Sequence, residues 1–299
     1  MKQYMFSKAL YLLLNLSLLV AGNQKRIVAV GDIHGDITNA KKVMHMVGAT
    51  DEEGNWIGGS DLTLVQTGDI IDRGDDTIKL FTWLSNLQNQ AKTAGGKFVM
   101  LLGNHEIMNL MGDWVDVTEG EKKTFGSIQA RKEAFSKDGW IGKFIRKLPV
   151  SVIIDGTVFV HGGIKKEYIL NGLDAMNKLG SKYINEDTED ELKTRKFFLQ
   201  DHDSPVWYRD YYVKPESEIC GKLKEVLDIL GAQRMVMGHT FTDDQTIEPK
   251  CDGMAYFIDV GMSSYYKPWS LFAALQLTKT DATAIYMDKK EKLKFIPSK

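Results

Sequence analysis

Acidic, amide and imidazole side chains recur in short glycine-containing segments of the sequence, each placed after an apolar run. The segments read GDIHG, GDIIDRG, GNHE, HGG and GHT. Imidazole, carboxylate and amide oxygen without thiolate are ligands that suit Mn, Fe or Zn rather than a closed structural zinc site. The candidate ligands and proton-transfer groups in these segments are Asp32, His34, Asp69, Asp72, Asn104, His105, His161 and His239.

Each of these residues has an ordinary structural explanation when it is taken singly. An Asp after Gly usually forms a turn or a helix cap, and a single His is more often a hydrogen-bonded structural residue than a ligand. Repetition favours a functional site, because five loops at one expected sheet edge carry such residues beside glycines that allow tight turns.

A centre of two metal ions needs a shared carboxylate and open positions for water and substrate, and this set of residues can supply one. Such a centre binds an oxyanion, lowers the pKa of a bridging water and holds it in line for attack on phosphorus. The sequence therefore predicts two divalent ions, Mn, Fe or Zn, and a phosphate-containing substrate.

The elements that must position these residues alternate from Lys25 onward. The stretches RIVAVGDIHGD, DLTLVQTGDIIDRGDD and KFVMLLGNHE each indicate a strand followed by a loop, with amphipathic helical stretches between them. This rhythm predicts an α/β fold whose active edge lies beyond the carboxyl ends of the strands. Asp155-Gly156 predicts a hairpin turn before the strand that ends at His161.

The second half of the chain continues with mixed elements. We expect a helix in GKLKEVLDILGA, a strand in QRMVMGHT, and antiparallel strands in MAYFIDVGMSS and LFAALQLTKTDATAIYMD. Residues 165–203 are richer in charge and in helix formers, so we interpret them as a helical cap inserted into one catalytic domain over residues 23–299.

Composition limits the classes of partner. The 299 residues are 43% hydrophobic, which is enough for a sizeable core, and the formal net charge is -2. Lysines and arginines are interspersed with acids rather than massed, so nucleic acid is not a favoured partner.

Residues 1–22 have the layout of a secretory signal peptide. Two lysines precede the uncharged apolar stretch ALYLLLNLSLLV, and cleavage after Gly22 would place small residues at the cleavage site. The apolar stretch is shorter than a membrane span requires. We therefore expect a protein of the secretory pathway or a secreted one, without stable membrane association after cleavage. Two alternatives stay open: an uncleaved anchor, and a cytoplasmic protein if the true start lies downstream.

The chain has two cysteines, Cys220 and Cys251. A disulfide framework that staples a small fold needs more cysteines than this, and the spacing does not demand that the two pair. We expect two separate, semi-buried thiols.

GDIHG, GDIIDRG, GNHE and HGG, in this order and with helix-sized gaps, resemble the signature of the phosphoprotein phosphatase family of calcineurin-like metallophosphoesterases. The resemblance extends from Gly31 to about Ser264. It implies a sandwich of two mixed β-sheets flanked by helices, with the active site at the carboxyl ends of the strands, and a phosphoric monoester hydrolase acting on phosphorylated protein or peptide.

The resemblance also implies roles for individual residues. Asp32, His34 and Asp69 would hold the first metal. Asp69 would bridge to a second metal completed by Asn104, His161 and His239. His105 would protonate the leaving oxygen, with Asp72 orienting it, and Glu106 would accept supporting hydrogen bonds. Arg73 and Arg209 would grip the phosphate.

Within the family, SPVWYRDYY and IDVGMSS resemble the Shewanella-type phosphatases more than the common eukaryotic serine/threonine enzymes. This branch leaves the choice between phosphotyrosine and phosphoserine or phosphothreonine open. Asp210 follows Arg209 where the motif usually has glycine, which adds a negative charge beside a phosphate-binding residue. We expect Trp207 to be a packing residue and leave Tyr208, Tyr211 and Tyr212 open. His45 and His202 are expected to lie outside the site.

Two other functions compete with a phosphoprotein phosphatase. The same metal centre could hydrolyse a dinucleoside polyphosphate or another small phosphoanhydride, but the NEDTEDELKTRK stretch of the expected cap is mixed in charge rather than basic. A catalytically silent metal-binding scaffold would be favoured by loss of a ligand or of the acid, and none is lost.

Overall fold

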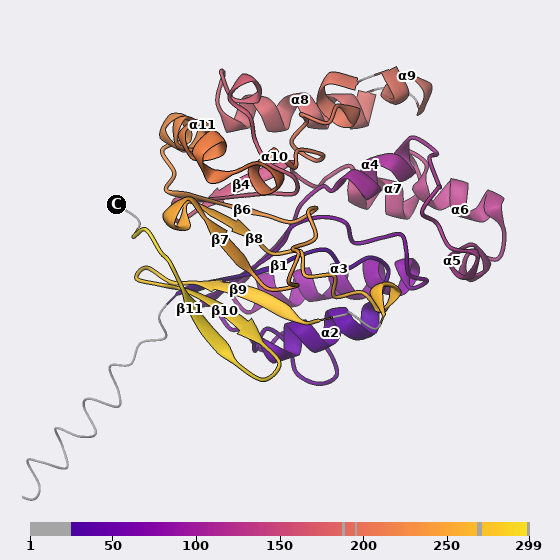
Figure 1. The fold of residues 1–299 in the computed structure, drawn as a ribbon. Helices are drawn as coiled ribbons and strands as arrows, with labels where there is room; N and C mark the ends of the chain where they lie inside the picture. The colour runs from indigo at the N-terminus through magenta and orange to yellow at the C-terminus, as the bar shows by residue number, and fades with distance from the viewer. Residues whose placement is uncertain (1–24, 187–188, 195, 268–270, 298–299) are drawn as a thin grey trace, which may run out of the picture.

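The computed structural model describes residues 25–186, 189–194, 196–267 and 271–297 (Figure 1). The expected signal peptide over residues 1–22 lies outside these residues. Within the described ranges, no helix is both long and apolar enough to cross a membrane.

The first sheet joins the start of the chain to its end. Its six strands lie in the order β11-β10-β9-β1-β2-β3. The three N-terminal strands are parallel, and the three C-terminal strands add to β1 as an antiparallel meander. The bounds are β1 Arg26–Val30, β2 Leu62–Gln66, β3 Lys97–Met100, β9 Ala273–Leu277, β10 Ala282–Tyr286 and β11 Lys290–Leu293.

The second sheet has five strands in the order β4-β5-β6-β8-β7. The bounds are β4 Ser151–Ile154, β5 Thr157–Val160, β6 Arg234–Met237, β7 Glu248–Lys250 and β8 Ala255–Phe257. The hairpin predicted at Asp155-Gly156 is confirmed, since Ile154 pairs with Thr157 across it. The antiparallel orientation expected for the MAYF strand is only partly right, because β8 is antiparallel to β7 but parallel to β6. A tight turn at residues 251–253 reverses the chain after β7 and sets this direction.

Helices cover the outer faces of the two sheets (Figure 1). The helices α2 and α3 lie against the six-stranded sheet, and α8 and α11 lie on the other side of the molecule with the five-stranded sheet. The α-helix bounds are α2 Ile37–Met46, α3 Thr77–Thr93, α4 Asn104–Leu110, α5 Glu119–Thr124, α6 Ile128–Phe135, α7 Trp140–Ile145, α8 Leu173–Glu186, α9 Glu189–Thr194, α10 Asp210–Val213 and α11 Glu216–Leu230. Short 3-10 turns span Lys166–Tyr168, Cys251–Gly253 and Ser264–Tyr266, and a π-helical turn spans Lys196–Gln200.

Side chains of the strands alternate between two apolar layers. On β1, Ile27 and Ala29 belong to the layer between the sheets, together with Phe159 of β5 and Val236 of β6. Val28 and its alternate neighbours pack instead into the layer beneath the helices. Strands buried on both faces account for the near-continuous apolar runs in the sequence. The predicted α/β fold of two mixed sheets flanked by helices is confirmed.

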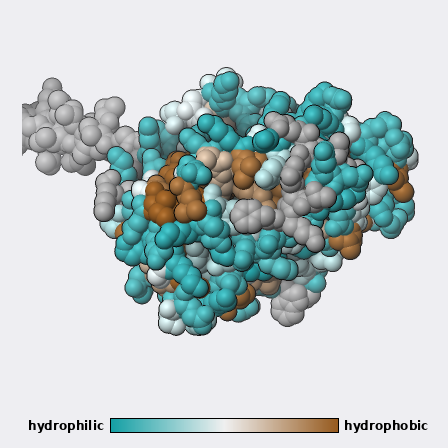
Figure 2. Space-filling model, turned by 90° about the horizontal axis from the view of Figure 1, so that it is seen from above, coloured by the Kyte–Doolittle hydropathy of each residue, from teal (hydrophilic) through white to brown (hydrophobic). Residues whose placement is uncertain are grey.

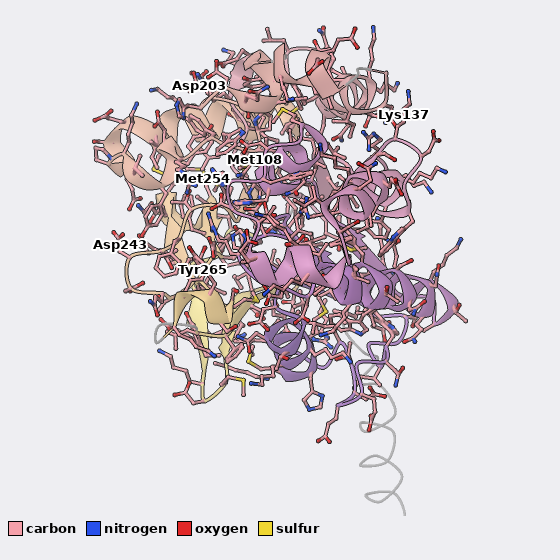
Figure 3. The ribbon with its side chains drawn as sticks, turned by 90° about the vertical axis from the view of Figure 1, so that its right-hand side faces the viewer. Met108, Lys137, Asp203, Asp243, Met254 and Tyr265 are labelled. Carbon is pink, nitrogen blue, oxygen red and sulfur yellow. A yellow bond between two sulfur atoms is a disulfide. The ribbon has the colours of Figure 1, made fainter. Side chains whose placement is uncertain are left out.

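The outer surface is mostly hydrophilic in the view from above, with hydrophobic areas of limited extent between polar side chains (Figure 2). Met108 of α4 is buried, at 6% exposed, whereas Lys137 and Asp203 lie toward the periphery (Figure 3). Residues 165–203, expected as a helical cap, contain α8 and α9, and their interpretation as a cap stays a prediction.

The expectation of two separate thiols is wrong. Cys220 on α11 and Cys251 after β7 form a disulfide, with their Cα atoms 5.4 Å apart. The backbone N–H of Cys251 also donates to the carboxylate of Glu216, at 2.7 Å, so two interactions join the first turns of α11 to the β7–β8 turn. Only the folded arrangement brings these positions together, because 31 residues separate the cysteines in the chain.

We predict that the double variant Cys220→Ser, Cys251→Ser folds but is less stable by about 3.5 kcal/mol. A cross-link over this loop length removes chain entropy from the unfolded state. Urea unfolding of the variant and of the wild type, with and without reductant, measures the difference. The reduced wild type should have the same free energy of unfolding as the variant. If reductant leaves the free energy of unfolding of the wild type unchanged, the prediction is wrong.

Candidate dimetal site

The polar segments meet at a seam between the two sheets. GDIHG follows β1, GDIIDRG follows β2 and GNHE follows β3, whereas HGG follows β5 and GHT follows β6. The five loops therefore come from two sheets, and the expectation of one sheet edge is corrected in this respect. The packing of one sheet against the other brings both sets of carboxyl strand ends to one place.

Two glycines allow the loops after β2 and β3 to touch. A Cβ atom at Gly68, where φ is +101°, would lie 2.7 Å from the backbone nitrogen of Gly103. A Cβ atom at Gly103 would lie 2.2 Å from Oδ1 of Asp69. Any larger residue would push these loops apart, so the glycines are required by the approach of one backbone to another.

Several site residues adopt a backbone conformation that non-glycine residues rarely use. The φ angles are 45° at His34, 56° at Asp69, 66° at Asp72, 65° at Arg73 and 64° at His239. Each costs on the order of 1 kcal/mol or more and persists only where the surroundings impose it. Because these conformations gather at the site, they indicate that the fold tolerates local backbone strain in order to direct these side chains into it.

Three imidazoles are oriented by acceptors at their Nδ1 atoms. His34 Nδ1 lies 3.1 Å from the carbonyl oxygen of Ile71, and His161 Nδ1 lies 2.9 Å from that of Thr67. His105 Nδ1 lies 2.8 Å from Oδ2 of Asp72. Because each of these acceptors takes a proton from Nδ1, the Nε2 atom of each ring is directed toward the site.

Asp69 is the residue that these Nε2 atoms share. Its Oδ2 lies 3.7 Å from Nε2 of His34 and 3.7 Å from Nε2 of His105, and its Oδ1 lies 3.2 Å from Nε2 of His161. Two groups of possible ligand atoms, each within 4.8 Å, both contain Asp69: one with His34 and His105, the other with His161 and His239.

The remaining predicted ligands lie in contact with these groups. Asp32 Oδ2 is 3.9 Å from Nε2 of His34, and its carboxylate accepts the backbone N–H of His239 at 3.1 Å. Asn104 Oδ1 is 2.9 Å from Nε2 of His161. The structure thus brings together all six residues predicted as metal ligands.

The electrostatics of the site fit bound cations. Asp32 is buried, and burial together with Asp259 and Asp69 raises its pKa well above the usual value. Burial also lowers the pKa of His34 to about 3 and that of His239 below its ordinary value, so both rings are neutral, as metal-binding imidazoles must be. Several buried carboxylates that repel one another beside neutral imidazoles form a donor set that suits two divalent ions.

Asp259 is a site residue that the sequence reasoning missed. It follows β8 in IDVG, is 3% exposed, and raises the pKa of Asp32 through charge repulsion. Burial raises its own pKa, and Asp69 adds to this effect. The signal in the sequence was weaker, because in IDVG the acid follows the strand without a glycine before it, whereas GDIHG, GDIIDRG and GNHE each begin with glycine.

His105, one of the residues grouped with Asp69, forms a buried pair with Asp72. Burial opposes a charge on His105, but the carboxylates of Asp69 and Asp72 outweigh burial and raise its pKa to about 9. Asp72 accepts from Nδ1, so a second proton on the ring would sit on Nε2, the nitrogen that faces the site, where a general acid needs it.

The two predicted phosphate-binding arginines contact residues of different ligand groups. Arg73 Nη1 is 2.8 Å from Nε2 of His34 and also donates to the hydroxyl of Tyr266. Arg209 is exposed and donates to the carbonyl oxygen of His239 at 2.6 Å. Asp210 forms an ion pair with Lys214 at 2.7 Å, which partly offsets the negative charge next to Arg209 in the chain.

The aromatic residues around Arg209 are mainly packing residues. Trp207 donates its ring N–H to the carbonyl oxygen of Leu199. Tyr208, Tyr211 and Tyr212 are at most 7% exposed, which argues against an open aromatic wall. His45, on α2, forms a hydrogen bond with the carbonyl oxygen of Thr50. His202 is exposed in the loop before Ser204. Neither histidine belongs to the ligand groups.

Glu106 joins the loops on which the site is built. Its carboxylate accepts the backbone N–H groups of Asp69 at 2.9 Å, Ile70 at 2.8 Å and Gly103 at 2.9 Å. Burial, and then the charge of Asp69, raises its pKa to about 7. The hydrogen-bonding role predicted for Glu106 is confirmed.

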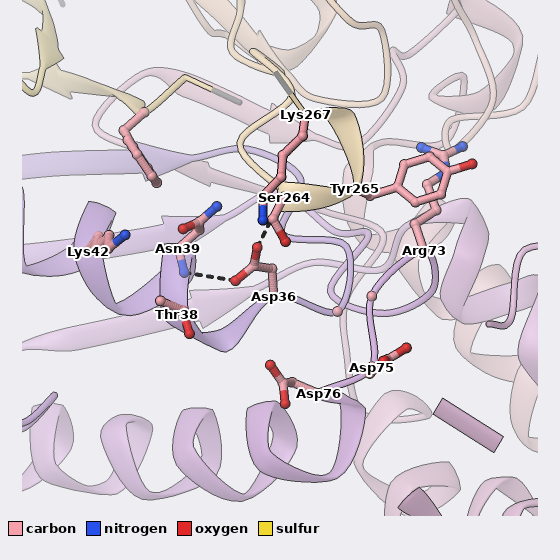
Figure 4. A pocket seen from close by; sticks show the side chains of 13 residues that line it. Asp36, Thr38, Asn39, Lys42, Arg73, Asp75, Asp76, Ser264, Tyr265 and Lys267 are labelled. Atoms are coloured by element: carbon pink, nitrogen blue, oxygen red, sulfur yellow. Dashed lines mark hydrogen bonds between the residues drawn. The ribbon is translucent and has the colours of Figure 1, made fainter. Parts of the chain in front are cut away.

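A cavity of about 610 Å³ opens beside Arg73 (Figure 4). Asp75 and Asp76 lie along one side of it, and Lys267 lies across from them. The cavity is large enough for a peptide side chain next to the site, and its mixed charges do not select one sign.

The sequence matches the calcineurin-like phosphoesterase family over residues 25–243. It is 32% identical to Shewanella-like protein phosphatase 2 of Arabidopsis thaliana over 80% of this chain and 72% of that protein. It is 30% identical to Shewanella-like protein phosphatase 1 of Plasmodium berghei over 89% of this chain and 76% of that protein.

The fold is also similar to a solved structure, the cold-active protein-tyrosine phosphatase of a psychrophilic Shewanella species. The TM-score is 0.78 at 26% identity, with 91% of this chain and 81% of that chain covered. These similarities confirm the resemblance that the four motifs indicate.

We predict that metal stoichiometry will follow the sharing of Asp69. After loading with Mn and dialysis, Asp69→Asn should retain neither ion, because both ligand groups lose a carboxylate oxygen. His161→Asn should lose one ion, and His45→Asn, outside the site, should keep two. Elemental analysis against protein concentration measures the ratio, and two ions on Asp69→Asn would rule out a shared ligand.

Proposed function

Because the chain belongs to the calcineurin-like phosphoesterase family, we propose that it is a metal-dependent phosphoprotein phosphatase of the Shewanella-like branch, hydrolysing phosphomonoesters of Tyr, Ser or Thr. One observation carries the proposal: Asp69 is common to two groups of possible ligand atoms, and His105, a member of the first group, is held by Asp72 through its other ring nitrogen. A shared carboxylate next to a protonated imidazole is the arrangement that phosphoester hydrolysis needs.

Asp32, His34 and Asp69 would hold one ion, and Asp69, Asn104, His161 and His239 would hold the other. When bound, two such ions supply an activated water as nucleophile and neutralise charge on the phosphate. Because the proposed ligands offer only nitrogen and oxygen donors and no thiolate, we expect the ions to be Mn, Fe or Zn.

The protein's own side chains would do the remaining work. Arg73 and Arg209 donate to the phosphate oxygens from two sides, a task suited to planar guanidinium groups. In the structure Arg73 contacts Nε2 of His34, a nitrogen that a metal would occupy, so Arg73 would turn toward the phosphate when the site is loaded. His105 gives its Nε2 proton to the leaving oxygen while Asp72 holds Nδ1.

The substrate class is the phosphoprotein for three reasons. The related proteins are named protein phosphatases, and the solved structural relative is a protein-tyrosine phosphatase. The cavity beside Arg73 offers room for residues that flank a phosphorylated side chain. Its lining sets the carboxylates of Asp36, Asp75 and Asp76 among basic and aromatic residues, and these acids disfavour a highly charged dinucleoside polyphosphate.

The disulfide supports a location in the secretory pathway. Disulfides persist in oxidising compartments and are rare in the cytosol. Cys220–Cys251 is therefore consistent with the leader-like segment over residues 1–22, although the segment itself lies outside the described residues.

We predict that the chain lacking residues 1–22, loaded with Mn, hydrolyses a phosphotyrosine or a phosphoserine peptide faster than a dinucleoside tetraphosphate. His105→Asn should lower kcat by about 10²- to 10⁴-fold while metal stays bound, because it removes only the proton donor. Asp69→Asn should abolish turnover.

Phosphate release, measured for each substrate, decides between the candidate functions. Faster turnover of the tetraphosphate would favour the phosphoanhydride hydrolase. Two bound ions without turnover of any substrate would favour the scaffold.

A further inference from the structure

Arg131, on α6, is fully buried although it carries a charge. Its guanidinium lies 4.4 Å from the ring centroid of Phe135 and 5.1 Å from that of Trp114. Burying an arginine is costly unless the charge is paired and hydrogen-bonded. The partners of Arg131 therefore indicate why the fold retains it.

One partner is a buried carboxylate. Arg131 donates from Nε at 3.0 Å and from Nη2 at 2.8 Å to Oε1 of Glu121 on α5. Both side chains of this pair are 0% exposed. The pair neutralises the charge of Arg131, but it does not account for the position of Arg131 behind the site.

The second partner leads to the proposed general acid. Arg131 Nη2 donates to Oδ1 of Asn109 at 2.5 Å, and the guanidinium lies 3.9 Å from Oδ1 of Asp72. Asn109 Nδ2 lies 3.0 Å from Oδ1 and 2.8 Å from Oδ2 of Asp72. Asp72 in turn accepts from Nδ1 of His105.

Arg131 fixes the direction of this chain of hydrogen bonds. A guanidinium only donates, so the oxygen of the Asn109 amide must face it and the NH₂ group must face Asp72. Both carboxylate oxygens of Asp72 are then held by donors, and the carboxylate plane is set relative to the ring of His105. Without Arg131 the oxygen of the Asn109 amide loses its donor. Only the bonds from Nδ2 to Asp72 and to the carbonyl oxygen of His105 would then orient the amide.

We propose that Arg131 is a positioning residue for catalysis, acting through Asn109 and Asp72 to hold His105 in the orientation that protonates the leaving oxygen. This inference rests on the proposed function, in which His105 is the general acid. Arg131 itself touches neither substrate nor metal ligand in this arrangement.

The test compares two substrates that differ in their need for an acid. 4-Nitrophenyl phosphate has a leaving group that departs readily as an anion. Phenyl phosphate has a leaving oxygen with a pKa of about 10, as in tyrosine, and depends more on protonation. Loss of His105 or of its positioning should therefore slow phenyl phosphate more than 4-nitrophenyl phosphate.

Two variants interrupt this series of hydrogen bonds at different points. Arg131→Met, Glu121→Gln removes the ion pair together, because leaving Glu121 charged and unpaired could prevent folding. Asn109→Ala leaves the ion pair intact. Arg234→Met is the matched control: Arg234 is 1% exposed and packs on Phe295, and it bonds Thr157 at the opposite strand ends.

We expect both variants to lower kcat for phenyl phosphate by about 10-fold or more, with KM nearly unchanged and a smaller loss for 4-nitrophenyl phosphate. The control should keep the wild-type ratio between the two substrates. The same substitutions in a His105→Asn background should cost little further activity, because residues that act through one group are not additive.

Equal losses on both substrates, or the same loss with and without His105, would overturn the positioning role and leave Arg131 a structural residue. Turnover by the wild type separates this failure from that of the proposed function. A wild type that holds two ions but hydrolyses neither ester would defeat the proposed function, and the inference with it.

Discussion

The carboxylate of Glu106 is the interaction on which the site depends. It accepts three backbone N–H groups, two from the loop after β2 and one from the loop after β3. These groups would otherwise be buried without partners, at a cost of about 1–3 kcal/mol each. The same bonds hold Asp69 in its positive-φ conformation beside Gly103, so one side chain fixes both the loops and the carboxylate proposed to bridge the two ions.

The packing of the two sheets explains how Asp69 comes to lie between histidines from both of them. His34 belongs to the six-stranded sheet, and His161 and His239 belong to the five-stranded sheet. Asp69 lies at the seam, with one carboxylate oxygen toward Nε2 of His34 and the other toward Nε2 of His161. A fold with one sheet edge would place these groups in a row, whereas two packed sheets place them around a common point.

Sequence reasoning predicted the ligands because they follow a repeated local rule of strand, glycine and polar residue. It failed where the information is not local. Cys220 and Cys251 are brought together by the packing of α11 against the β7–β8 turn, which no spacing encodes. Arg131 was missed for the same reason: in the sequence it is one charged residue of an ordinary helix, and only its burial against Glu121 and Asn109 marks it. Asp259 follows its strand but lacks the glycine before it, so it matches the local rule only in part.

The proposed metal ligands and the proposed general acid are supported in part by different elements of the fold. The ligands depend on loop backbones and on carbonyl oxygens such as those of Ile71 and Thr67. The acid depends on side chains contributed by α4, α5 and α6, which lie to one side of both sheets (Figure 1). The separation runs in one direction. A change in α5 or α6 leaves the loops after β1, β2 and β5 with their own hydrogen bonds, whereas a change in the seam also reaches the acid, because Asp72 shares a loop with Asp69 and the backbone N–H of His105 donates to Asp69.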